Sequence, residues 1–358
     1  MTKRVAVISL TYYDEPRYLN EAALSLTETV YPRDHVAWVI VDNSCHGPSA
    51  RYVREHIVPR SGRNLPEVIF VENDENVGFA KGNNQGIRWA LDHGYDYVFL
   101  LNNDAKLAPT TISEAVRVAE VHPQAGAVQP MILLWNDPTR INTSGNDIHY
   151  LGFGITRNLG EFRTSYAYRE GERIGYASGA GVLYRAKALR DVGLLEEFFW
   201  MYHEDLEMGW RLRLAGWESI LAPSAEVFHD YEFRRSTKKM YWMERNRLLT
   251  HISHLSWRSL LLLAPALLFM EAVVFAGALS GGWGGQKVRS WLWMVDPCCW
   301  RYIRKTRKMI GQLRMQSDRE VCALFVGRIK HQEVDRFFVR ALLNPSLALY
   351  WIIAKRCL

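Results

Sequence analysis

The fold is decided between residues 5 and 44, which read VAVISLTYYDEPRYLNEAALSLTETVYPRDHVAWVIVDNS. Residues 18–30 are amphipathic, and they separate two short apolar runs, Val5 to Leu10 and Ala37 to Val41. Apolar runs of this length with a helical pattern between them indicate a β–α–β unit. Because both runs are apolar throughout, as strands covered on both faces are, they predict a mostly parallel sheet with helices on both sides.

The alternation of short apolar runs and helical patterns continues beyond this unit. It predicts further strands at 68–71, 97–101 and 127–133, and helices at 51–57, 87–93 and 112–121. A loop-rich stretch over 136–174 is followed by a predicted turn and strand from Ser178, a helix at 187–192, and strands at 218–222 and 225–231. This regular alternation is typical of α/β folds and predicts one domain over residues 1–235.

Polar side chains follow several of the predicted strands. Thr11 follows the first strand, Asp42 the second, and Asn102-Asn103-Asp104 the strand at 97–101. Ligands of open α/β sheets bind beyond the carboxyl ends of the strands, so these loops lie on the ligand side. A carboxylate at the end of a core strand is typical of a divalent cation bound through oxygen ligands, which makes Asp104 a candidate metal ligand.

A glycine- and asparagine-rich segment over residues 72–86 reads ENDENVGFAKGNNQG. We interpret it as a turn that feeds the helix at 87–93, with a glycine spacing that differs from the dinucleotide-binding fingerprint. Glycines let a backbone approach a ligand, asparagines offer donors and acceptors, and Lys81 could meet a phosphate. The segment is a candidate nucleotide-binding loop; the alternative is a polar loop that only caps a helix.

A candidate catalytic stretch over residues 198–211 reads FFWMYHEDLEMGWR. Leu206, Trp210 and Leu214 recur at helical spacing, so the helix is predicted to begin near Glu204 or Asp205. The helix macrodipole favours ionised carboxylates at this end, and the aromatic run before it makes one wall of the site dry. Such a carboxylate suits a general base; the alternative is a helix cap on a buried element.

The composition of the 358 residues is that of a folded protein, with 48% apolar and 23% charged residues. The net charge is +6, and basic residues outnumber acidic ones between 287 and 340, which indicates an anionic surface as partner.

The five cysteines include no C-x-x-C pair, so neither a disulfide framework nor a zinc site is indicated, and a reducing cytoplasmic setting is expected. Residues 5–10 are too short for a signal peptide and are interpreted as the first strand.

The region 236–358 has a different character. Basic and aromatic residues alternate after Tyr231, a pattern that can bind RNA but suits the lipid headgroup layer better here, because an apolar run over 260–279 follows. About 20 residues can span a bilayer, but Pro265, Glu271 and two basic flanks favour a re-entrant or interfacial segment on the cytoplasmic face. Basic amphipathic helices are expected over 301–340. The alternative is a helical appendage that packs on the catalytic domain or on a second subunit, as in a homodimer.

Taken in order, six segments resemble the inverting family-two glycosyltransferases of the glycosyltransferase A fold. The resemblance covers residues 3–235 and is strongest to the rhamnosyltransferase-like and galactofuranosyltransferase-like branch. The segments that carry it are 41–44, 76–86, 101–104, 178–181, 204–211 and His229. The residues after the candidate base are Met208-Gly209-Trp210-Arg211, whereas processive synthases are expected to have Q-x-x-R-W there. Addition of one or few sugars is therefore expected.

The resemblance implies transfer of a sugar from a nucleotide-diphosphate donor, with inversion, to a lipid-linked or cell-envelope glycan. The alternatives are a soluble or protein acceptor, or a nucleotide-binding scaffold without activity; nucleic acid is not an expected partner. One positioned base and a separate Mg²⁺ or Mn²⁺ site suffice for inversion. Asp205 is implied as the base, with Glu204 as the neighbouring candidate, and Asp104 and His229 as metal ligands. Asn102 replaces an aspartate found in many relatives, which removes one anionic ligand.

The remaining site residues are assigned by the same resemblance. The donor side comprises Thr11, Asp42, Asn76, Lys81, Asn84, Asn103, Asp104 and Arg211, of which Thr11, Asp42 and Asn84 would hold the nucleoside. The acceptor side comprises Ser178, Gly179, Trp200 and His203. Arg211 has two interpretations, because it could approach the diphosphate or form an i,i+4 ion pair with Glu207.

Overall fold

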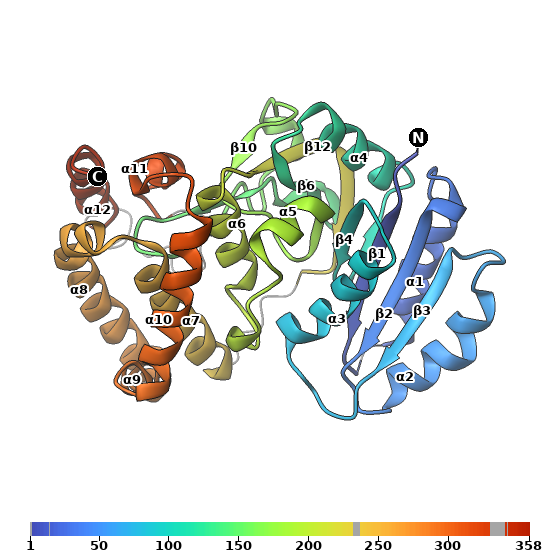
Figure 1. Cartoon of the computed structure of the whole chain (residues 1–358), viewed down its shortest axis with the longest axis horizontal. Helices are drawn as coiled ribbons and strands as arrows, with labels where there is room; N and C mark the ends of the chain where they lie inside the picture. The colour runs from blue at the N-terminus through green and yellow to red at the C-terminus, as the bar shows by residue number, and fades with distance from the viewer. Residues whose placement is uncertain (1, 14, 232–236, 330–340, 342) are drawn as a thin grey trace.

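Figure 1 shows the computed structural model of the chain, which describes residues 2–13, 15–231, 237–329, 341 and 343–358. A ten-stranded sheet has the order β10-β12-β6-β11-β4-β1-β2-β3, with β5 paired to β12 and β7 to β6. The strands of its parallel part are β1 (Val5–Thr11), β2 (Val36–Asp42), β3 (Glu67–Glu72) and β4 (Tyr97–Leu101). The helices that cover the sheet are α1 (Pro16–Thr27), α2 (Pro48–Tyr52), α3 (Phe79–Asp92), α4 (Thr111–Val121), α5 (Ala186–Val192) and α6 (Glu204–Leu214). The predicted α/β fold with a mostly parallel sheet is confirmed.

The parallel strands are buried on both faces of the sheet. In β1, Val5 and Val7 pack into the hydrophobic cluster on one face, and Ala6 and Ile8 into the cluster on the other. All four side chains are fully buried. Successive side chains of a strand point to opposite faces, so a strand covered on both sides is apolar at most positions, and the buried Ser9 of β1 accepts from Nε1 of Trp38 at 3.1 Å. This is why uninterrupted apolar runs identified these strands.

Helix α3 begins at Phe79, eight residues before the predicted start at Ile87. Its glycines lie against β1: a Cβ atom at Gly82 would stand 2.5 Å from Cδ1 of Leu10, and one at Gly86 would stand 2.7 Å from Cγ2 of Ile8. Glycine inside a helix costs about 1 kcal/mol relative to alanine, and here it permits the close approach of helix and strand. Most of the segment interpreted as a ligand-binding turn is therefore the first half of a packed helix.

The edge of the sheet beyond β4 also departs from the predicted elements. Residues 218–222 and 225–231 were expected as two strands, but β12 (Glu218–His229) is one strand, with a register shift between Ala222 and Glu226 against β6. The bulge accommodates Pro223, which cannot donate to a ladder. The remaining strands are β5 (Ala105–Leu107), β6 (Ala125–Leu134), β7 (Asp137–Thr143), β10 (Arg173–Ile174) and β11 (Gly181–Arg185), with β8 (Asn146–Ile148) and β9 (Gly154–Thr156) as a separate hairpin.

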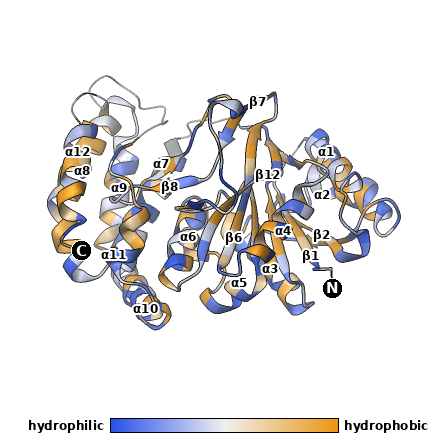
Figure 2. Ribbon diagram, turned by 90° about the horizontal axis from the view of Figure 1, so that it is seen from above, coloured by the Kyte–Doolittle hydropathy of each residue, from blue (hydrophilic) through white to orange (hydrophobic). Residues whose placement is uncertain are grey.

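The described part of the C-terminal region contains α7 (Thr237–His254), α8 (Trp257–Ser280), α9 (Gly284–Met294), α10 (Pro297–Leu313), α11 (Asp318–Val321) and α12 (Asn344–Ala354). Among the described residues, α8 alone is long and apolar enough to cross a membrane, and only 17% of its most apolar window is buried. Figure 2 shows hydrophobic residues on α8 and α12, which lie side by side at the far end of the molecule from the N-terminus. The predicted domain boundary at residue 235, and the expected helical residues 330–340, lie outside the described residues.

A buried cluster of charges fastens α8 to its neighbours. Glu271 of α8 bonds to Arg247 of α7 and, at 2.7 Å, to Lys287 of α9, and both cations also bond to Glu244. Arg247 and Lys287 are 1% and 0% exposed. The basic residues of α7 were expected to form a surface that binds lipid headgroups. This expectation is wrong for Arg245 and Arg247, which are buried. Arg247 is tolerated inside because Glu244, three residues before it, and Glu271 of α8 compensate its charge.

Candidate active site

The donor side is built at the carboxyl ends of β1 and β2. Thr11 and Asp42 are opposite each other in the register of the two strands, and Oγ1 of Thr11 donates to Oδ1 of Asp42 at 2.8 Å. The amide and hydroxyl of Ser44 donate to Oδ2 of Asp42 at 2.9 and 2.7 Å. These bonds fix the carboxylate at the strand end, where ligands of such sheets bind. The structure brings these two predicted residues together.

A network of side-chain amides shapes the loop between β3 and α3. Oδ1 of Asn76 accepts from the Gly78 amide at 2.9 Å, and Nδ2 of Asn43 donates to Oδ1 of Asn76 and to the Gly78 carbonyl at 3.3 and 3.2 Å. Lys81 is exposed in the first turn of α3. Asn76 thus shapes the loop through backbone contacts, and Lys81 presents a cation beside it.

Asn84 does not have the free side chain that a nucleoside contact requires. It is buried within α3, where its Nδ2 donates to the Leu195 carbonyl and to Glu197 at 2.8 and 3.0 Å, and its Oδ1 accepts from the Leu195 amide at 3.0 Å. Both polar atoms of the amide are engaged. Asn84 ties α3 to the loop before the carboxylates, which corrects its expected role at the nucleoside.

The predicted metal ligands meet at the junction of β4, β5 and β12. Pairing of β5 with β12 places Ala105 opposite His229, so Nε2 of His229 lies 3.1 Å from Oδ1 of Asp104. Nδ1 of the same ring lies 2.9 Å from Oδ1 of Asn142. A neutral imidazole donates from only one of its two nitrogens. The oxygens of Asp104 and Asn142 are therefore both satisfied only if the second nitrogen carries a proton or binds a metal ion. This donor set fits a divalent metal.

The metal corner offers few protein ligands. The described residues contain no group of three or more His, Cys, Asp and Glu side chains around one point. Asn103 is half-buried in the turn between β4 and β5. The side chain of Asp104 is 33% exposed, so an ion can reach its carboxylate from solvent. A Mg²⁺ or Mn²⁺ ion here would take one oxygen and one imidazole nitrogen from the chain, with Asn142 orienting the ring.

The backbone before the carboxylates is strained. Trp200, Tyr202 and His203 have φ angles of 62°, 64° and 77°, in the left-handed region that non-glycine residues rarely occupy. Each such residue costs about 1–3 kcal/mol, and strain of this kind concentrates at functional sites. The Trp200 carbonyl accepts from the Phe79 and Ala80 amides at 2.7 and 3.3 Å, so this loop caps the N-terminus of α3.

Helix α7 holds the strained loop in place. Nδ2 of the fully buried Asn246 donates to the carbonyls of Phe199, Met201 and Tyr202 at 3.1, 3.0 and 2.8 Å. Arg245 donates to Oδ1 of Asn246 at 2.9 Å and to the Phe198 carbonyl at 2.7 Å. The sequence does not reveal this role of Asn246, because the partners of its side-chain amide lie more than forty residues away and nothing in its own helix distinguishes it.

Glu204 and Asp205 begin α6, as predicted. Asp205 is half-buried, and it accepts from the Leu206 amide at 2.7 Å and the Gly179 amide at 3.4 Å. Glu204 is 7% exposed, and its Oε2 has no partner among the described residues. Burial raises the pKa of Asp205, and burial together with the neighbouring Asp205 raises the pKa of Glu204 further. A proton therefore resides on Glu204 more readily than on Asp205, so Asp205 is the more readily ionised of the two.

The expected acceptor-side residues separate into two groups. Ser178 and Gly179 are half-buried beside Asp205, and the Ser178 amide donates to Oε1 of Gln129 at 2.8 Å. The ring of Trp200 lies 5.2 Å from that of Trp242 on α7. His203 has a different environment: burial and Arg247 lower its pKa to about 3, and the Gly152 backbone bonds to it. Its surroundings are thus α7 and the turn between β8 and β9, and its place on the acceptor side stays a prediction.

Arg211 belongs to the packing of α6 and not to the donor side. It is 3% exposed, donates to Glu207 at 2.6 Å, and also donates to the carbonyls of Val192 and Leu194 at 2.8 and 2.7 Å. Although burial opposes ionisation, Arg211 and His254 hold the pKa of Glu207 at about 2. Of the two interpretations, the i,i+4 ion pair is the one observed, and the expected contact of Arg211 with a diphosphate is corrected.

Sequence comparison places these features among known proteins. Residues 4–249 match the family described as glycosyltransferase like family 2, a range that includes most of α7. N-acetylglucosaminyl-diphospho-decaprenol L-rhamnosyltransferase of Mycobacterium tuberculosis is 32% identical over 253 residues, which are 64% of this chain and 76% of that protein. Galactofuranosyltransferase GlfT1 of Mycolicibacterium smegmatis is 29% identical over 192 residues, 51% of this chain and 57% of that protein.

Solved structures share the fold. GalNAc-T7 with UDP, GalNAc and Mn²⁺ matches 90% of this chain and 56% of its own, with a TM-score of 0.63 and 12% identity. Mannosyltransferase PcManGT from Pyrobaculum calidifontis, in complex with GDP-Man and Mn²⁺, matches 87% and 85% with a TM-score of 0.50 and 19% identity. The resemblance carried by the six sequence segments is confirmed. With more than half of its length matched by the family model, the chain belongs to glycosyltransferase like family 2.

Proposed function

We propose that the chain transfers a sugar from a nucleotide-diphosphate donor, with inversion, to a glycan acceptor linked to a lipid, and that Asp205 is the general base. The observation that carries this proposal is the placement of Asp205, half-buried at the start of α6 and flanked by a strained loop and the Gly179 amide. The buried Glu204 beside it takes a proton more readily, so Asp205 is free to accept one.

In this mechanism the carboxylate of Asp205 removes the proton of the acceptor hydroxyl as its oxygen attacks the anomeric carbon. The bond from that carbon to the diphosphate breaks on the opposite face, which inverts the configuration. Asp104 and His229 would hold a Mg²⁺ or Mn²⁺ ion, which neutralises charge on the leaving diphosphate when bound. Thr11 and Asp42 lie at the strand ends that would receive the nucleoside, and Lys81 would lie near phosphate.

A lipid-linked acceptor is favoured over a soluble one by two observations. The Mycobacterium tuberculosis relative is named for an acceptor that joins N-acetylglucosamine through a diphosphate to decaprenol. The second observation is the apolar surface of this chain: Leu261 and Leu268 of α8 are 76% and 70% exposed, and Ile353 of α12 is 59% exposed. Contiguous apolar surface of this kind marks an interaction with a membrane or a partner. We infer that the acceptor sugar is presented at a membrane surface, with L-rhamnose as the first donor sugar to test.

We infer further that α8 lies in the membrane interface without crossing it, at the cytoplasmic face. The middle of α8 is fastened by Glu271 to Arg247 and Lys287. If α8 crossed the bilayer, these charges and the helices that carry them would lie near its midplane, where charged groups are costly. A helix with one side anchored to protein and the other apolar suits the interface.

The test is transfer by the purified full-length chain in detergent. Decaprenyl-diphosphate-linked N-acetylglucosamine would be incubated with dTDP-, UDP- and GDP-sugars in the presence of Mn²⁺, and the product analysed by mass spectrometry and by NMR of the anomeric proton. We expect one donor to give a product with one or few added sugars and inverted configuration. Donor binding without transfer to lipid-linked or soluble sugars would instead support a scaffold, and retention of configuration would exclude the single-base mechanism.

A further inference from the structure

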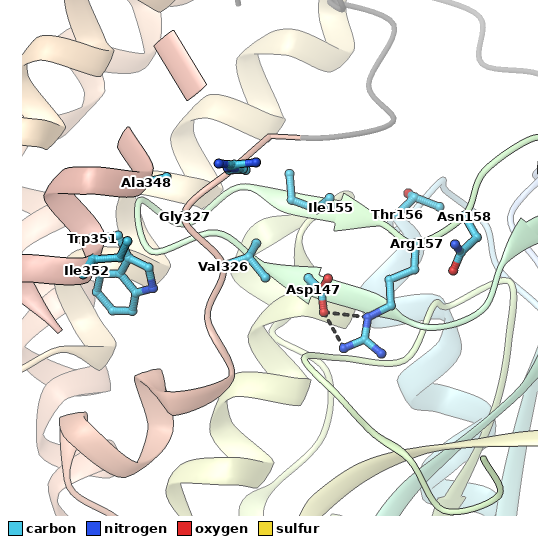
Figure 3. A pocket seen from close by; sticks show the side chains of 11 residues that line it. Asp147, Ile155, Thr156, Arg157, Asn158, Val326, Gly327, Ala348, Trp351 and Ile352 are labelled. Atoms are coloured by element: carbon cyan, nitrogen blue, oxygen red, sulfur yellow. Dashed lines mark hydrogen bonds and ion pairs between the residues drawn. The ribbon is translucent and has the colours of Figure 1, made fainter. Parts of the chain in front are cut away.

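A pocket of about 500 Å³ lies away from the residues assigned to donor, metal and base. It is formed between the β8–β9 hairpin and α12, with the backbone of residues 326–328 between them (Figure 3). Its volume is within the range of small-molecule sites. Neither the proposed mechanism nor the packing of the sheet uses this space.

The walls of the pocket differ in chemistry. Ile155, Val326, Trp351 and Ile352 provide an apolar wall, and Thr156, Arg157 and Asn158 of the hairpin provide a polar one, as Figure 3 shows. A ligand that fits both walls has a hydrocarbon part and a polar end.

The two arginines that line the pocket, Arg157 and Arg328, have different surroundings. Arg157 is neutralised within the protein, because it forms ion pairs with Asp147 and, at 3.0 Å, with Glu172. Arg328, which also lines the pocket, is exposed and forms no ion pair with any carboxylate in the described part of the chain. Among the described lining residues, Arg328 is thus the cation that can pair with a negative group such as a phosphate.

The apolar wall continues into the exposed surface of α12 and α8. Ile352 lines the pocket and is 55% exposed, and Leu349 on the same helix is 61% exposed. Helix α12 is fixed against α8, since the hydroxyl of Tyr350 donates to the Leu262 carbonyl at 2.5 Å. A hydrocarbon chain could therefore pass from the apolar face into the pocket while remaining against apolar residues.

The polar side of the pocket is close to the catalytic helix. The β8–β9 hairpin rests on α6: a Cβ atom at Gly154 would stand 2.3 Å from the Tyr176 hydroxyl and 3.3 Å from Cδ1 of Leu206, the residue after Asp205. Asn146 of the same hairpin bridges to Tyr176. The hairpin that lines the pocket thus also contacts the helix that begins at Glu204.

We propose that this pocket binds the first isoprenoid units and the adjoining phosphate of the lipid-linked acceptor, with Ile352 and Trp351 against the hydrocarbon and Arg328 facing the phosphate. The inference rests on the proposed function and adds the place where the lipid is held. It predicts that the enzyme recognises the isoprenoid next to the diphosphate in addition to the acceptor sugar at Asp205.

The first test compares two neighbouring residues on α12. Ile352→Asp changes the pocket wall, whereas Ile353→Asp changes an equally exposed residue that does not line it. Transfer would be measured in detergent micelles with two diphosphate-linked acceptors that differ only in their lipid, decaprenol or a single methyl group. For Ile352→Asp we expect the KM of the decaprenyl acceptor to rise about tenfold, because a charge replaces an apolar contact. The methyl acceptor and the Ile353→Asp variant should change by less than about twofold.

Two further arms identify the ligand. Arg328→Gln should raise the KM of both diphosphate-linked acceptors, whereas Arg356→Gln, an exposed cation on the segment after α12, should not. A benzophenone amino acid at position 352, but not at 353, should cross-link to decaprenyl phosphate, and unlabelled acceptor should compete. Cross-linking only to phosphatidylglycerol added to the micelles would show a site for bulk lipid and overturn the proposal.

The outcomes separate this inference from the proposed function. If the unaltered chain transfers sugar to the decaprenyl acceptor, but Ile352→Asp and Ile353→Asp behave alike, the pocket is not the lipid site although the function stands. If the unaltered chain transfers no sugar to any lipid-linked acceptor, the proposed function is wrong. The cross-link to decaprenyl phosphate then decides on the pocket alone.

Discussion

The sheet and the C-terminal helices distribute charge and apolar surface in opposite ways. The strands β1 and β2 are buried and apolar, and their polar side chains gather at the ends, as Thr11 and Asp42 do. The C-terminal helices bury Arg247 and Lys287 and expose leucines and isoleucines along α8 and α12. The first pattern is that of a water-soluble enzyme core. The second is the pattern expected where the surroundings are lipid and ions are compensated internally.

The two regions meet at the loop before Asp205. Its Trp200 carbonyl caps α3 on the sheet side, and its Phe199, Met201 and Tyr202 carbonyls accept from Asn246 on the C-terminal side. Strained backbone persists only where its surroundings determine it from several directions. The C-terminal helices therefore take part in shaping the site, in addition to any attachment to a membrane.

The largest expected effect is at this meeting point. Asp205→Asn should lower kcat by at least about 10²-fold, because the acceptor hydroxyl loses its base, while the donor Kd stays within about twofold. Stopped-flow turnover and calorimetric titration of the donor would measure the two quantities. Glu204→Gln is the matched control and should retain most activity. If Glu204→Gln is inactive and Asp205→Asn turns over normally, the base is Glu204.

The next effect concerns the ions of the C-terminal helices. Glu271→Gln should lower the free energy of unfolding by about 3–5 kcal/mol, because it leaves the buried Arg247 and Lys287 with one carboxylate between them. Thermal unfolding of the detergent-solubilised full-length chain would show the loss. Glu114→Gln, which removes an exposed i,i+3 pair with Arg117, should cost less than about 1 kcal/mol. Equal losses in the two variants would mean that the cluster is not buried as described.

On the sheet side, the metal corner gives the third effect. Asp104→Asn should raise the Mn²⁺ concentration for half-maximal activity at least about tenfold, because one of the two protein ligands loses its charge. Asn142→Ala should give a smaller increase, since Asn142 only orients His229. Titration of Mn²⁺ into metal-free enzyme would measure both values. Full activity of the unaltered chain in excess EDTA would contradict the metal site.

The fourth prediction is a shift in the pH dependence of turnover. Transfer needs Asp205 ionised, and burial raises the pKa of this carboxyl above the usual value of about 3.9. As the pH falls through the raised pKa, Asp205 takes up a proton and kcat falls; above it, the base is fully ionised. The acid limb of kcat should therefore lie at a higher pH than for an ordinary aspartate. An acid limb of kcat at or below the usual pKa of aspartate would mean that the base is exposed to water.

The sequence predicted the sheet better than the site. Uninterrupted apolar runs identified β1, β2 and β4 because a doubly covered strand is apolar at most positions, and the strand ends identified Thr11, Asp42 and Asp104. What it could not predict depends on partners far along the chain. Gly82 and Gly86 appeared to form a loop because glycine disfavours a helix, and only contact with β1 explains them. The saturation of Asn84 by residues 195–197, and the compensation of Arg247 by Glu271, likewise leave no local signal.

The smallest expected effect is that a cysteine before α8 and a cysteine after it are labelled alike. If α8 lies in the interface, residues before and after it are on the same side of the membrane, and a single crossing would place them on opposite sides. Cys45 precedes α8 and Cys357 follows α12, and both are exposed. An impermeant maleimide should label neither in intact cells and both after lysis, whereas the buried Cys322 would be uninformative in either state. Labelling of Cys357 alone in intact cells would show that the chain crosses the membrane. The sheet and the end of the C-terminal region would then lie on opposite sides of the bilayer.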